Sequence, residues 1–159
     1  NVTVIGDSIT VAATGGLKHA YPGVYVDAKV SRSIERAPGL IENLKAGGEL
    51  RKFVVVSLST NSMISDHQID ELVDEIGPGH TLVLVTGYGP SRTTWVPPTN
   101  EAIVRAAQRH SNVVVADWNA RIREHTDLLA GDHVHPKGAR GVHLYVSSIT
   151  EALNRAQQR

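Results

Sequence analysis

Short apolar runs alternate with helical periodicities along this 159-residue chain. The runs are rich in β-branched residues and lack the alternation of apolar and polar residues that is typical of strands with one solvent-exposed face. We therefore expect strands that are buried on both faces. Such alternation favours parallel strands, right-handed crossovers and helices on both faces of the sheet. The sequence therefore predicts an α/β fold, a three-layer α/β/α sandwich with a five-stranded parallel sheet in the order 2-1-3-4-5. The expected strands are Val2–Ile5, Val24–Val26, Phe53–Leu58, Thr81–Thr86 and Val113–Ala116.

Helical signals fill the segments between these strands. A Ser65-x-x-Gln68 capping box precedes an apolar stripe at i, i+3, i+4 and i+7 spacing. Pro38 and Pro97 stand where first helical turns are expected, since proline is tolerated there. The last helix is predicted from a stripe made of Val142, Tyr145, Val146, Ile149 and Leu153.

The composition excludes several function classes. Sixteen basic and sixteen acidic residues balance without long runs of either sign, which gives no support to nucleic-acid or membrane-surface binding. The absence of cysteine excludes disulfides and cysteine metal sites, and the histidines lack ligand spacing, so we expect no metal and no cofactor. Strand residues begin almost at Asn1, so we expect residues 1–159 to be a single domain that is either cut from a longer membrane protein or a processed product.

Gly6-Asp7-Ser8 ends the first expected strand and precedes a helix. A sharp strand-to-helix turn lifts a serine hydroxyl to the carboxyl edge of the sheet, beside the backbone N–H groups that open the helix. Ser8 is thus a candidate nucleophile, although a helix-capping serine would fit the same place. Asp7 is expected to support the turn or cap the helix.

A base and its orienting carboxylate lie near the other end of the chain. Asp132 precedes His135 by three residues, a spacing at which one turn can carry both. An imidazole activates a serine hydroxyl best when a carboxylate fixes its tautomer. We therefore expect Ser8 as nucleophile, His135 as general base and Asp132 as its orienter. His133 is a competing histidine, which we expect to point away on an extended segment and to be a decoy or a substrate contact.

The candidate residues all follow expected strands or precede the last helix. In parallel α/β sheets, sites form at the carboxyl edge of the strands. Ser31-Arg32, Thr60-Asn61 and the segment from Tyr88 to Trp95 follow the second, third and fourth strands. They should therefore lie at one edge together with Ser8 and His135.

At these residues the chain resembles the SGNH (GDSL-like) hydrolase superfamily, which implies a flavodoxin-like fold. Gly6-Asp7-Ser8 matches the nucleophile block and Asp132-x-x-His135 the acid–base block. The third block usually reads Gly-x-Asn-Asp and here reads Ser59-Thr60-Asn61-Ser62. The resemblance implies that the Asn61 amide and the Ser8 and Ser31 backbone N–H groups form an oxyanion hole. Ser31 stands where the family has glycine, which adds a Cβ to that turn.

Looser motifs resemble one branch, the extracytoplasmic SGNH domains attached to acyltransferase family 3 membrane proteins. Members related to peptidoglycan O-acetyltransferases acetylate the C6 hydroxyl of N-acetylmuramoyl residues. The resemblance implies an acyl-Ser8 intermediate, an acetyl donor delivered by a membrane acyltransferase domain, a glycan acceptor and a cell-surface location. The motifs are Val26–Arg32, Ser59-Thr60-Asn61, Arg92…Trp95…Asn100, Asp117-Trp118 and Asp132-x-x-His135-Pro136-x-Gly138.

Alternatives stay open for the peripheral residues. Asn61 could be an ordinary turn residue after a strand. Arg32 could contact substrate or support the structure, and Trp95 could stack on a sugar face or cap the core. Asp117-Trp118 is expected to be structural.

Three functions remain in competition. The first is O-acetyl transfer to a cell-envelope glycan, the second is an esterase of the same fold in which water is the acceptor, and the third is a glycan-binding module without turnover. The Ser8, His135 and Asp132 set argues against the third, and the first two differ in how well water is excluded from the acyl-enzyme.

Overall fold

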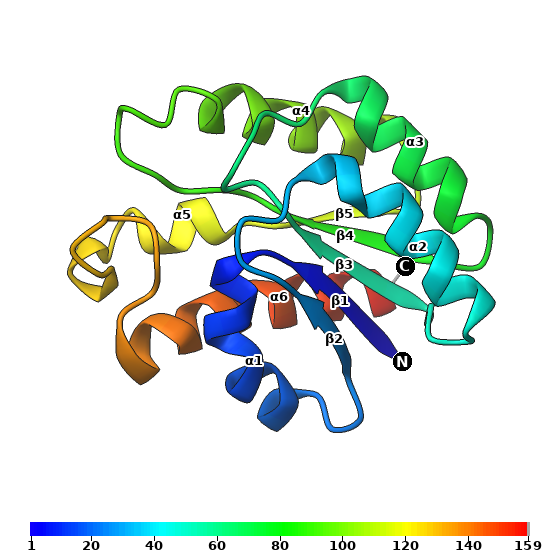
Figure 1. Ribbon diagram of the computed structural model, residues 1–159, viewed down its shortest axis with the longest axis horizontal. Coiled ribbons are helices and arrows are strands. Elements are labelled where there is room, and N and C mark those ends of the chain that lie inside the picture. The colour runs from blue at the N-terminus through cyan, green and yellow to red at the C-terminus, as the bar shows by residue number, and fades with distance from the viewer. Residues whose placement is uncertain (159) are drawn as a thin grey trace.

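A parallel five-stranded sheet lies at the centre of the structure, a computed structural model that describes residues 1–158 (Figure 1). The strand order is β2-β1-β3-β4-β5, which confirms the predicted topology. All four neighbouring pairs are parallel, as short apolar strands joined by helices require. The strands are β1 Val2–Gly6, β2 Tyr25–Ala28, β3 Phe53–Ser57, β4 Thr81–Val85 and β5 Val113–Ala116.

Helices cover both faces of this sheet. One face carries α1, α5 and α6, and the other carries α2, α3 and α4 (Figure 1). The Ser65–Gln68 capping box is present at the start of α3, as predicted. The helices are α1 Ser8–Ala20, α2 Ala37–Ala46, α3 Asp66–Ile76, α4 Val96–Arg109, α5 Trp118–Ile122 and α6 Gly138–Gln157, with 3-10 turns at Ile34–Arg36 and Thr126–Leu128.

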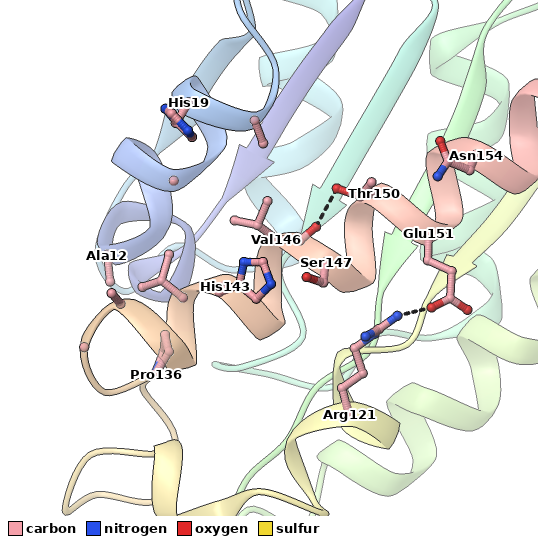
Figure 2. A pocket seen from close by; sticks show the side chains of 15 residues that line it. Ala12, His19, Arg121, Pro136, His143, Val146, Ser147, Thr150, Glu151 and Asn154 are labelled. Carbon is pink, nitrogen blue, oxygen red and sulfur yellow. Dashed lines mark hydrogen bonds and ion pairs between the residues drawn. The ribbon is translucent and has the colours of Figure 1, made fainter.

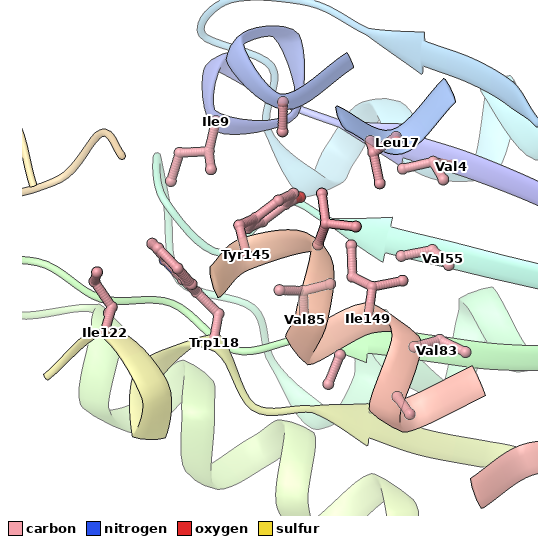
Figure 3. Close-up of a cluster of buried hydrophobic side chains, with 14 of the residues drawn as sticks. Val4, Ile9, Leu17, Val55, Val83, Val85, Trp118, Ile122, Tyr145 and Ile149 are labelled. Atoms are coloured by element: carbon pink, nitrogen blue, oxygen red, sulfur yellow. The ribbon is translucent and has the colours of Figure 1, made fainter. Parts of the chain in front are cut away.

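The two faces of the sheet bury separate hydrophobic clusters. Because successive strand residues point to opposite faces, Val4 joins the cluster under α1 and α6 while Ile5 joins the cluster under α2 and α3. Figure 3 shows the first cluster, where Trp118 meets Tyr145 edge-to-face with ring centroids 5.5 Å apart. This double burial explains the absence of polar alternation in the central strands.

The second strand departs from that pattern. All four residues of β2 are half-buried, so the expectation that this strand is buried on both faces is wrong. The physical reason is its helix cover: β2 lies at the edge of the sheet and packs mainly against α1, whereas β5 at the opposite edge packs against both α4 and α6. The strand nevertheless ends beside Gly6, which brings its following loop to the edge where α1 begins.

Helices α1 and α6 pack closely against each other. A Cβ on Gly16 would lie 2.9 Å from Val142 Cγ1 and 3.3 Å from Val146 Cγ2, so the two helices need glycine at this crossing. Both helices begin at the carboxyl edge of the sheet, and their packing fixes the distance between those two starts. Within residues 1–158, no helix has the length and apolar character that a membrane crossing requires.

Candidate active site

The turn between β1 and α1 places Ser8 at the first position of a helix. Asp7 caps this helix, since Asp7 Oδ1 accepts a hydrogen bond of 3.1 Å from the Ile9 N–H. A Cβ on Gly6 would come within 1.9 Å of Thr10 Oγ1, so the turn demands glycine there. The role expected for Asp7 as a helix cap is confirmed.

Ser8, His135 and Asp132 form a continuous hydrogen-bonded chain. Ser8 Oγ lies 2.7 Å from His135 Nε2, and His135 Nδ1 lies 2.5 Å from Asp132 Oδ2. The carboxylate therefore holds the proton on Nδ1, which leaves Nε2 free to accept the Ser8 proton. The structure brings together the three residues that the sequence selected from its two ends.

The local fold explains the spacing of three between Asp132 and His135. Asp132 Oδ1 accepts the N–H groups of Val134, at 2.9 Å, and of His135, at 3.1 Å, while Oδ2 faces the imidazole. Partial burial raises the pKa of Asp132, but the hydrogen bonds from Val134 and His135 outweigh it and bring that pKa to about 2. The orienting carboxylate is therefore an anion at any pH near neutrality.

The loop after β2 holds Ser31 in a left-handed conformation, with φ of +64°. Glycine adopts this conformation most easily, which agrees with Ser31 occupying a place where the superfamily has glycine. The Asn61 amide donates one hydrogen bond of 3.0 Å to the Arg32 carbonyl and so ties the third loop to the second. Because an amide carries two N–H bonds, one remains for a ligand.

Arg32 is turned into the protein. Its guanidinium donates to Asp27 Oδ1 at 2.9 Å and to the Asp27 carbonyl at 2.8 Å, and 9% of its side chain is exposed. These contacts favour the structural alternative for Arg32 over a substrate contact, and they fix the backbone that carries Ser31.

The other peripheral residues have distinct surroundings. The Trp95 indole N–H donates to the Thr60 carbonyl at 2.9 Å, so its ring is held against the loop that carries Asn61. His133 is exposed with φ of +58°, so the expected extended segment is wrong: the chain turns there, and the His133 N–H donates to the Ala130 carbonyl. Asp117 caps α5 and Trp118 is buried, which confirms their structural role.

Two contacts of the site were not expected from the sequence. Arg92 Nη2 lies 3.3 Å from the Asp132 carbonyl, so the loop after β4 contacts the loop that carries Asp132 and His135. Beneath Ser8, the buried Tyr145 hydroxyl contacts Thr10 and Ser57. Tyr145 belongs to the apolar stripe of the last helix, and nothing in that spacing distinguishes a core tyrosine from one that joins three segments.

A large groove runs between α1 and α6 (Figure 2). Its volume is about 1010 Å³, and its floor includes Gly16, Val142 and Val146. It begins beside Pro136 but contains none of Ser8, Asp132 and His135. Residues 1–158 hold no cluster of three or more histidine or carboxylate side chains that could bind a metal ion.

The chain is similar over most of its length to curated proteins that are named as O-acetyltransferases. It is 30% identical over 151 residues to "Peptidoglycan O-acetyltransferase OatA" of Listeria monocytogenes, a match that covers 95% of this chain and 24% of that protein. The chain thus spans about a quarter of the length of the curated relatives it matches. No family model matches the sequence.

Solved structures of similar size superpose on nearly the whole of this chain. The C-terminal catalytic domain of Streptococcus pneumoniae peptidoglycan O-acetyltransferase A, with a methylsulfonyl adduct, superposes with a TM-score of 0.89 at 29% identity. That match covers 99% of this chain and 94% of the other. A lipolytic G-D-S-L family protein from Veillonella parvula superposes with a TM-score of 0.76 at 16% identity, covering 97% and 98% of the two chains, which supports the fold alone.

Proposed function

The chain is an SGNH (GDSL-like) domain that resembles the catalytic domain of a peptidoglycan O-acetyltransferase, and we propose that it transfers an acetyl group to a glycan hydroxyl through an acyl-Ser8 intermediate. The observation that carries this proposal is the chain of hydrogen bonds from Ser8 through His135 to Asp132 on that fold. The proposal concerns this domain and its own residues.

The first half-reaction acylates Ser8. His135 Nε2 accepts the hydroxyl proton as Ser8 Oγ attacks the carbonyl carbon of the acetyl donor. The carbonyl oxygen becomes an oxyanion, and its collapse breaks the bond to the leaving oxygen, which takes the proton from His135. Asp132 stabilises the imidazolium that exists between these two transfers.

The second half-reaction releases the acetyl group to the acceptor. His135 removes the proton of a sugar hydroxyl as its oxygen attacks the acyl carbon, and Ser8 leaves with that proton. The two steps mirror each other, so one base serves both. The backbone N–H groups of Ser8 and Ser31 and the remaining Asn61 N–H are the donors that would stabilise the oxyanion.

The comparisons support a proposal for the acceptor and for the surroundings of the domain. The Listeria monocytogenes relative is named for acetylation of peptidoglycan, so we propose a cell-wall glycan as acceptor. We further propose that this domain lies outside the cytoplasm and receives its acetyl groups from a membrane acyltransferase domain of the same protein. The greater length of the curated relatives leaves room for such a domain.

Hydrolysis is the second candidate reaction, and the solvent exposure of the site supports it. The side chains of His135 and Asp132 are 37% and 43% exposed, so water reaches the site in the free protein. Transfer then requires that a bound acceptor displaces this water. The preformed Ser8–His135 hydrogen bond disfavours a module that binds glycan without turnover.

The test incubates the domain with an acetyl ester donor and a chitooligosaccharide or muroglycan, and mass spectrometry measures O-acetylated sugar. We expect transfer by the wild type and none by Ser8→Ala. Ser147→Ala is the matched control, because Ser147 lies beside His143 in the α1–α6 groove, and we expect it to be fully active.

Two outcomes would contradict the proposal. Release of free acetate at every acceptor concentration, with no acetylated sugar, would establish the esterase instead. Absence of both activities, together with no labelling of Ser8 by a sulfonyl fluoride, would support the binding module.

A further inference from the structure

A second cavity opens beside the proposed oxyanion hole. It lies between the loop after β2 and helix α2, and its volume is about 770 Å³. Ser31 belongs to its wall, so the cavity and the oxyanion hole share a residue. Cavities of this size accommodate ligand groups larger than an acetyl moiety. The wall also includes Lys29, Arg36, Gly39 and Asn43.

The cavity carries unpaired positive charge. Lys29 and Arg36 form no ion pair with any described residue, whereas Arg32 beside them is paired with Asp27. The carboxylate on the wall, Glu35, accepts a hydrogen bond from the Ser33 hydroxyl, which lowers the Glu35 pKa and keeps it anionic. The two cations exceed this single anion, so the cavity favours an anionic group.

The wall is fixed before a ligand binds. The Lys29 N–H donates to the Gly6 carbonyl, the Arg32 N–H donates to the Lys29 carbonyl, and the Asn61 amide holds the Arg32 carbonyl. The loop therefore does not have to become ordered on binding, which removes part of the entropic cost of recognition.

We propose that this cavity is the subsite for a carboxylate carried by the glycan acceptor. The inference rests on the proposed function, because it assumes that the acceptor reaches Ser8 from this edge. The reacting hydroxyl lies at His135, and a substituent of the same acceptor extends past Ser31 to Lys29 and Arg36. A neutral acceptor would reach the same triad without this contact.

Helix α2 offers a substitution that changes the charge of the cavity alone. Gly39 is exposed within α2 and lines the cavity, and a Cβ on it would have no atom within 4 Å. Gly39→Glu adds an anion, while Gly39→Gln adds nearly the same volume without charge. Both replace a helical glycine, so neither should weaken the fold. Gly15→Glu is the matched control, since Gly15 is an exposed, uncrowded glycine on α1 outside this cavity.

The measurement is calorimetric binding to protein that also carries Ser8→Ala, so that no turnover occurs. The two probes are a muroglycan fragment with free carboxylates and the same fragment after amidation of those carboxylates. We expect the parent to bind the untreated fragment roughly fivefold more tightly, from two exposed charge contacts. Gly39→Glu and the double variant Lys29→Ala/Arg36→Ala should lose this preference, and Gly39→Gln and Gly15→Glu should keep it.

Equal binding of the two fragments by the parent would overturn the subsite, and so would equal effects of Gly39→Glu and Gly39→Gln. The transfer assay separates this from the proposed function. Acetylation of both fragments without a carboxylate preference would refute the subsite alone. Suppose instead that binding shows a carboxylate preference but the protein with intact Ser8 acetylates neither fragment. This result would refute the transferase and leave the subsite.

Discussion

The Tyr145 hydroxyl joins three chain segments beneath Ser8. It donates to Ser57 Oγ at 2.7 Å and lies 2.8 Å from Thr10 Oγ1, and Tyr145 is fully buried. Thr10 belongs to the helix that begins at Ser8, Ser57 ends the strand before the Asn61 loop, and Tyr145 lies on the helix that follows His135. One hydroxyl thus positions the proposed nucleophile, base and oxyanion donor relative to one another.

We therefore expect Tyr145→Phe to lower kcat about tenfold with KM nearly unchanged, because a small misplacement of reacting groups is costly. Steady-state kinetics with a soluble acetyl ester would measure both constants. Tyr21→Phe is the control: the Tyr21 hydroxyl joins α1 to Val146 and Thr150 of α6, away from the triad. A purely structural role for Tyr145 would lower kcat equally in the two variants, or would raise KM.

Asp7 makes the fold sensitive to pH. Burial raises its pKa above the ordinary 3.8, and the Ile9 N–H and nearby Thr60 offset this in part. The folded protein therefore holds this proton more tightly than the unfolded chain, so the contribution of Asp7 to stability decreases as pH rises through 3.8 and the folded pKa. Asp7→Asn keeps a capping side chain and removes the charge.

For Asp7→Asn we accordingly expect a larger free energy of unfolding than wild type at pH 7, and a difference that shrinks as pH falls toward 3. Urea unfolding at several pH values would measure it. A variant that is less stable than wild type at pH 7 would show that the Asp7 carboxylate stabilises the fold after all.

At the scale of elements, adjacent glycines on α1 have opposite roles. Gly15 faces open space, whereas a Cβ on Gly16 meets Val142 and Val146 of α6. We expect Gly15→Ala to stabilise the protein by about 0.5–1 kcal/mol through helix propensity. Gly16→Ala should be less stable than Gly15→Ala by about 1–3 kcal/mol, the usual cost of overpacking. Thermal unfolding would compare the pair, and equal midpoints would mean that α6 moves aside freely.

The sequence predicted most elements because their signals are local. The capping box at Ser65 and the proline at position 38 act within one helical turn, and both occur where expected. The burial of β2 was predicted wrongly, although its place at the edge of the sheet was predicted correctly. How far helices cover an edge strand is not a local property: α4 and α6 both pack on β5, the other edge strand, whereas α1 is the main helix that packs on β2.

At the scale of the whole molecule, the parallel topology made the site predictable. Once strands alternate with right-handed crossovers, Ser8, Asn61 and His135 must reach the same sheet edge, whatever their separation in sequence. The contacts of Arg32 and Tyr145 could not be predicted in this way. Packing among several elements decides whether the Arg32 guanidinium turns toward Asp27 or toward solvent. It also decides which hydroxyls meet beneath Ser8.

The distance along the chain between Ser8 and His135 has a consequence for biosynthesis. These partners are 127 positions apart, and each is placed by the start of a different helix, so a growing chain carries its serine long before it carries the imidazole. Synthesis that stalls before His135, or proteolysis between Ser8 and His135, yields a product whose Ser8 lacks its proposed base. Under the proposed mechanism such fragments cannot form the acyl-Ser8 intermediate.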